Sequence, residues 1–126
     1  MTEPTKPTFG EIINRALKGT DADWDFVDAN LGPHLTPKNF QWAINYGTRD
    51  PNDNARDLAA TIMARSDELL DGANQKIFLH QMEGDRNVFV RHWLANALYK
   101  RGNRHPEVVA MWEEACKAQT PAGDFA

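Results

Sequence analysis

Residues 50–66 read DPNDNARDLAATIMARS, and residues 85–101 read DRNVFVRHWLANALYKR. When the chain is shifted by 35 residues, three polar pairs coincide: Asp50 with Asp85, Asn52 with Asn87, and Arg56 with Arg91. A period of this size is typical of an α-solenoid, in which each unit adds a pair of helices to the previous one. The repeat therefore predicts a stack of helical hairpins.

Helical spacing extends over most of the chain, because apolar residues recur every three or four positions. Thr36-Pro37 and His105-Pro106 each open a helix, and Asp21 or Asp23 caps another. No stretch alternates apolar and polar residues as a strand does. The expected helices cover residues 9–17, 21–31, 36–46, 55–63, 71–83, 90–98 and 105–116. We predict an all-α fold of about six to seven helices, arranged as a right-handed stack of hairpins.

The composition describes one helical domain, which we expect over residues 8–118, with a disordered tail at 1–7 and a loose tail at 119–126. The chain has 126 residues, a net charge of −4 and one cysteine, so an intramolecular disulfide is excluded. The longest apolar run, residues 108–112, is too short to cross a bilayer. We therefore expect a cytoplasmic protein with no membrane contact.

The repeated pattern of Asp, Asn and Arg resembles the HEAT repeat family over residues 50–117. In that family, an aspartate before a helix and an arginine six residues later form hydrogen-bonded ladders between neighbouring units. The resemblance implies this structural role for four residues: Asp50, Arg56, Asp85 and Arg91. An exposed cap and an exposed arginine are the alternative interpretation.

The last part of the chain is also similar to a single tetratricopeptide repeat. The similarity rests on residues 94–100, Gly102 and residues 112–115. One residue too many separates Gly102 from Trp112 for that family, and Arg91 stands where it prefers an aromatic residue. Both families consist of stacked helix pairs, so the predicted architecture is the same.

Few residues suggest catalysis, and we recognise no catalytic motif, metal site or cofactor site. His80 and Glu83 share a helix face, yet no second helix offers a matching pair of metal ligands. Cys116 falls near the C-terminal end of a helix among Trp112 and Ala115, without an activating neighbour, so we interpret it as a core or half-buried residue. An enzyme has no support in the sequence.

The leading functional hypothesis is a protein or peptide interaction module, because stacked hairpins form a continuous groove. We expect the third, fifth and seventh helices to line that groove. Trp42, Ile77 and Trp112 recur there at 35-residue spacing, and we expect Trp112 to be buried. The candidate contact residues are the polar neighbours of these apolar positions: Asn39, Gln41, Asn45, Gln75, His80 and Glu113.

The alternative hypothesis is a HEAT-like domain that binds nucleic acid through residues 86–105. That segment contains no acidic residue, and aromatic residues alternate there with basic ones. The candidate phosphate-binding residues are Arg86, Lys100, Arg101 and Arg104. Cations at the end of a helix also have an ordinary structural explanation, since they interact favourably with its dipole.

Overall fold

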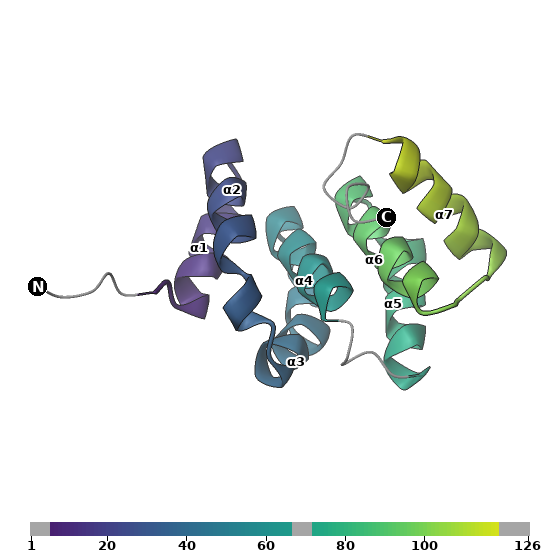
Figure 1. The fold of residues 1–126 in the computed structure, drawn as a ribbon, viewed down its shortest axis with the longest axis horizontal. Helices are drawn as coiled ribbons and strands as arrows, with labels where there is room; N and C mark the ends of the chain where they lie inside the picture. The colour runs from purple at the N-terminus through teal and green to yellow at the C-terminus, as the bar shows by residue number, and fades with distance from the viewer. Residues whose placement is uncertain (1–5, 67–71, 119–126) are drawn as a thin grey trace, which may run out of the picture.

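The computed structural model describes residues 6–66 and 72–118 (Figure 1). Within those two ranges it contains seven α-helices and no β-strand, which confirms the all-α prediction. The helices are α1 (Phe9–Lys18), α2 (Asp21–Asn30), α3 (Pro37–Asn45), α4 (Asp53–Arg65), α5 (Gly72–Gly84), α6 (Val88–Lys100) and α7 (Pro106–Lys117). Two short 3₁₀ turns, Gly32–His34 and Gly47–Arg49, flank α3. The predicted tail at 119–126, most of the tail at 1–7 and the predicted helix start at Asp71 lie outside the described residues.

Side chains at the helix starts explain where the chain enters each helix. Thr36 accepts a backbone N–H bond and Pro37 takes the first position of α3, as predicted. The cap of α2 differs from the prediction, because Thr20 takes this position instead of Asp21 or Asp23. The Thr20 hydroxyl accepts the N–H of Asp23, and the Asp23 carboxylate accepts the N–H of Thr20 in return. This reciprocal pair satisfies two backbone donors that a helix start leaves open.

The helices α4 and α6 lie side by side in the middle of the molecule (Figure 1). On the α4 side, α3 packs against α4, and α1 packs against both α2 and α4. On the α6 side, α5 and α7 each pack against α6. The two central helices therefore contact one another, and α1, α3, α5 and α7 each pack against one of them.

The hydrophobic core follows this arrangement. Nine of the 13 residues of α4 and eight of the 13 residues of α6 are buried. Leu58 and Ile62 from α4 lie in one apolar cluster with Leu94 and Leu98 from α6, and all four are fully buried. No helix in the described part of the chain is both long enough and apolar enough to span a membrane.

The turn between α3 and α4 requires a glycine at position 47. A Cβ atom added at Gly47 would lie 2.6 Å from the Cβ of Ala59 and 3.1 Å from the ring of Trp42. We expect Gly47→Ala to lower the free energy of unfolding by about 1–3 kcal/mol, because a packed core resists added volume. Urea denaturation would measure this loss. Gly84→Ala is the control, since a Cβ there meets nothing within 4 Å; equal losses for the two variants would contradict the prediction.

Candidate functional site

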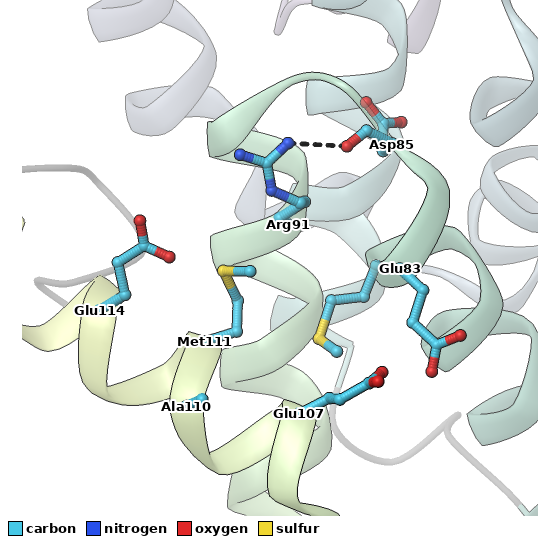
Figure 2. A pocket seen from close by; sticks show the side chains of 8 residues that line it. Glu83, Asp85, Arg91, Glu107, Ala110, Met111 and Glu114 are labelled. Carbon is cyan, nitrogen blue, oxygen red and sulfur yellow. Dashed lines mark hydrogen bonds between the residues drawn. The ribbon is translucent and has the colours of Figure 1, made fainter.

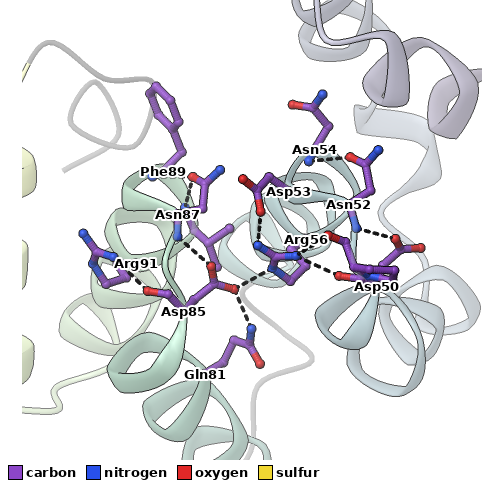
Figure 3. A network of polar contacts seen from close by, with 12 residues as sticks. Asp50, Asn52, Asp53, Asn54, Arg56, Gln81, Asp85, Asn87, Phe89 and Arg91 are labelled. Carbon is purple, nitrogen blue, oxygen red and sulfur yellow. Dashed lines mark hydrogen bonds and ion pairs between the residues drawn. The ribbon is translucent and has the colours of Figure 1, made fainter.

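Two equivalent turns precede α4 and α6, 35 residues apart (Figure 3). In the first turn, the Asp50 carboxylate accepts the backbone N–H of Asn52 at 2.8 Å. In the second, the Asp85 carboxylate accepts the N–H of Asn87, also at 2.8 Å. Each asparagine side chain then accepts a backbone N–H two residues later and caps its helix. The sequence repeat thus corresponds to a repeated set of hydrogen bonds.

The two arginines of the repeat make the same bond within their own turns. Arg56 donates from Nη1 to the carbonyl oxygen of Asp50 at 2.9 Å, and Arg91 donates from Nη1 to that of Asp85 at 2.8 Å. Each guanidinium therefore ties the first turn of its helix to the residue six positions before it.

Only one of these arginines also connects the two turns. Arg56 donates from Nε to Asp85 Oδ2 at 3.0 Å, and it pairs with the Asp53 carboxylate as well. Asp85 accepts a further bond from the Gln81 side chain at 2.6 Å. The side chains of Arg56 and Asp85 are 10% and 1% exposed. This buried ion pair joins α4 to the turn before α6. The bond from Arg91, in contrast, goes to the backbone carbonyl oxygen of Asp85.

The six predicted contact residues lie on α3, α5 and α7 and differ in their exposure. Gln41, Asn45, His80 and Glu113 are exposed, and Gln75 is half-buried. Asn39 is buried, and its side-chain amide donates to the carbonyl oxygen of His34 at 2.8 Å, so it is unavailable to a partner. None of the six lines either of the two pockets described below.

The predicted basic patch is divided between the two ends of α6. Arg86 precedes this helix of 13 residues, which is about 20 Å long, while Lys100, Arg101 and Arg104 lie at its far end. Arg101 donates to the carbonyl oxygen of Ala97 at 2.7 Å, and Arg104 donates to that of Tyr99 at 2.7 Å. These two arginines satisfy carbonyl groups at the helix end, and Arg86 is too distant to join them.

Three side chains are stacked where α6 meets α7. The Arg104 guanidinium lies 3.7 Å from the centre of the Tyr99 ring, and Trp112 stacks on that ring at 3.7 Å with an angle of 6° between the planes.

Trp112 is half-buried, so the burial expected for it is only partial. Ile77 is 40% exposed, so Trp42, Ile77 and Trp112 do not form one buried seam. Cys116, predicted to be core or half-buried, is exposed.

A pocket of about 630 Å³ spans three helices, α2, α4 and α6, instead of the predicted α3, α5 and α7. Its charged lining consists of four aspartates: Asp21, Asp25, Asp28 and Asp57. Its aromatic lining consists of Trp24, Phe89 and Trp93. No lysine, arginine or histidine is among the lining residues that the structure describes. We call this site the acidic pocket.

The sequence contains a local signal for part of the acidic pocket. Asp21, Asp25 and Asp28 follow each other at spacings of four and three, so they share one face of α2, and Trp24 lies beside them. The contributions of Asp57 and Phe89 have no such signal, because they depend on how α4 and α6 pack against α2.

Asp57 occupies the most unusual environment in the acidic pocket. Its pKa is raised to about 7, chiefly by burial and also by the negative charges of Asp28 and Asp85, while the nearby Thr61 hydroxyl, which donates to the backbone carbonyl oxygen of Asp57 at 2.8 Å, acts in the opposite direction. Its Oδ1 atom is buried and has no hydrogen-bond partner among the described residues. Burial also raises the pKa of Asp28, which the positive charge of Arg65 lowers and the negative charge of Asp25 raises.

A second pocket, of about 580 Å³, lies between α5, α6 and α7 (Figure 2). Glu83 and Glu107 point toward each other there, and the interaction of the Glu107 carboxyl group with that of Glu83 raises the pKa of Glu83. Met111 and Arg91 supply other parts of its lining. Within residues 6–66 and 72–118, no three side chains of His, Cys, Asp or Glu are grouped to hold a metal ion.

Comparison with protein-family profiles, with curated proteins and with solved structures finds no significant match to the chain.

Proposed function

We propose that the chain is a short helical-repeat protein, a right-handed α-solenoid of the HEAT-like kind, that binds a protein or peptide partner. The observation that carries the proposal is the acidic pocket, which takes lining residues from three successive even-numbered helices. In a stack of hairpins, alternate helices face the same side and offer a continuous surface to an extended ligand. A cytoplasmic location, expected from the sequence, belongs to the same proposal.

The repeated turns support the HEAT-like part of this proposal. The bond from Arg56 to Asp50 recurs 35 residues later as the bond from Arg91 to Asp85, and Arg56 also reaches Asp85 in the next turn. A ladder between neighbouring units needs such a bond from one unit to the next.

The aromatic side chains of the acidic pocket support partner binding. Phe89 is 40% exposed, although a phenyl ring gains free energy when it leaves water. Aromatic residues commonly supply most of the binding energy at the centre of an interface. The four aspartates disfavour a phosphate backbone, and the predicted basic residues are divided between the ends of α6. The proposal is therefore a protein or peptide partner, not nucleic acid.

A peptide library displayed on phage and selected on the immobilised full chain would test the proposal. We expect selected peptides to bind in calorimetric titrations, and we expect Phe89→Ala to weaken binding by about 2 kcal/mol, or roughly 30-fold, because it removes a central anchor. Tyr46→Ala is the matched control, since Tyr46 is 70% exposed and does not line the pocket. An absence of binders, or equal effects of the two substitutions, would contradict the proposal.

A further inference from the structure

The acidic pocket also indicates the chemistry of its partner. Resting on the proposed function, we infer that it receives a cationic side chain, an arginine or a lysine of the bound peptide, between Asp28 and Asp57. The aromatic residues Trp24, Phe89 and Trp93 surround the remainder of that side chain.

The lining of the acidic pocket carries an excess of negative charge. Asp28 on α2 and Asp57 on α4 come from different helices and raise each other's free energy when both are ionised, as the influence of Asp28 on the pKa of Asp57 indicates. Asp21 and Asp25 add negative charge along the same face of α2. Arg65 partly offsets the charge of Asp28, yet the pocket lining itself supplies no cation among the described residues. A cation between the two carboxylates relieves their repulsion.

Asp57 also has an unused hydrogen-bond acceptor. Buried polar atoms in folded proteins nearly always have a hydrogen-bond partner. Asp57 Oδ1 is buried and has none among the described residues, and the Thr61 hydroxyl donates instead to the backbone carbonyl oxygen of Asp57. A guanidinium or an ammonium group provides N–H donors and positive charge together, so it supplies the missing partner when the carboxyl group turns toward the pocket.

Three aromatic side chains also line the acidic pocket. Aromatic faces attract arginine and lysine through their π electrons, and the aliphatic stems of these residues pack well on apolar surface. A pocket of about 630 Å³ is far larger than a single inorganic ion and falls in the size range of pockets that hold organic ligands. Carboxylates and aromatic rings together therefore favour a side chain that has a charged end and an apolar stem.

Three fluorescent peptides of equal length would test the inference. Each carries identical test residues separated by glycine and serine: arginine in one peptide, lysine in the second, and neutral citrulline in the third. We expect the arginine or the lysine peptide to bind the full chain at least about tenfold more tightly than the citrulline peptide, as for a charge-assisted hydrogen bond. The preference between arginine and lysine distinguishes a guanidinium site from an ammonium site.

Asp57→Asn and Asp28→Asn should each weaken binding of the preferred peptide at least about tenfold, because each removes one of the two charges. Glu11→Gln should leave it unchanged, because Glu11 is exposed and lies outside the pocket. Thermal melts of all three variants verify that they fold. Equal binding of the citrulline peptide, or full binding by both aspartate variants, would overturn the inference.

The phage selection separates the failure of this inference from the failure of the proposed function. If selected peptides lose affinity with Phe89→Ala but contain no arginine or lysine, the proposal of an interaction module is supported and the inference of a cationic side chain is overturned. If self-association, measured by analytical ultracentrifugation, occupies the pocket and disappears with Phe89→Ala, the occupant is a second copy of the chain and the inference is overturned.

Discussion

Replacing Arg56 with alanine is expected to lower the free energy of unfolding by about 3–5 kcal/mol, the usual cost of removing one partner from a buried ion pair. Arg56 is the cation that faces the buried carboxylate of Asp85, and the Asp85 side chain is only 1% exposed. The substitution leaves that carboxylate buried with the Gln81 amide and the backbone of Asn87 as its donors. Urea denaturation with circular dichroism would measure the loss.

Arg91→Ala is the matched control for this prediction. Arg91 holds the equivalent position in the repeat, but it is half-buried and donates to the backbone of Asp85, so its loss should cost about 1 kcal/mol. In double-mutant cycles, Asp85→Ala should couple more strongly with Arg56→Ala than with Arg91→Ala, because only Arg56 contacts the deleted carboxylate. Equal costs for Arg56 and Arg91 would contradict a connection between the two turns.

The stability of the chain is expected to fall as the pH rises from about 4 to about 8, and Asp57→Asn should remove most of that decrease. The pKa of Asp57 is raised to about 7 in the folded state from an ordinary value of 3.8. Between these values the folded state holds a proton that the unfolded state has released, so each increase in pH favours unfolding. At pH 8 the full penalty is of order 4 kcal/mol, because a tenfold difference in proton affinity corresponds to about 1.4 kcal/mol.

Chemical denaturation of both proteins at acidic, intermediate and mildly alkaline pH would test this. We expect similar stability near the acidic end of the range and a clear advantage of Asp57→Asn at the alkaline end. The groups that act on Asp57 come from several elements: Asp28 on α2, Thr61 on α4, and Asp85 in the turn before α6. Asp28→Asn should reduce the pH dependence less than Asp57→Asn does, because burial is the largest cause of the raised pKa. Equal pH dependence of the wild type and Asp57→Asn would show that Asp57 is ionised at little cost, because groups such as His92, whose pKa burial lowers, affect both proteins alike.

The sequence predicts the local features of this fold well, because they depend on residues close together in the chain. Helical spacing, prolines and glycines place the seven helices, and the Asp–Asn turns lie where the repeat indicates. The prediction is wrong at the cap of α2, since a threonine and two aspartates compete for that position within four residues.

The candidate site depends on contacts that a sequence pattern does not contain. The polar residues predicted on α3, α5 and α7 are neighbours of three apolar residues at 35-residue spacing, yet the pocket with aromatic and charged lining is formed by α2, α4 and α6. The resemblance implies a ladder between neighbouring units but does not say which side chains it joins. The Asp85 carboxylate pairs with Arg56, 29 residues earlier, because α4 packs against α6.

The helices differ in how many other helices pack against them. We expect this difference to determine the order in which parts of the domain unfold. Because α7 packs mainly against α6, thermal motion can detach it while α4 and α6 stay together. Before α7 can detach, the stacking contacts among Arg104, Tyr99 and Trp112 must break, and Trp112 then loses its aromatic neighbour. By contrast, α4 and α6 are enclosed by other helices and open only when the whole domain unfolds. In a variant without the other three tryptophans, we therefore expect the fluorescence of Trp112 to report a local opening that precedes global unfolding.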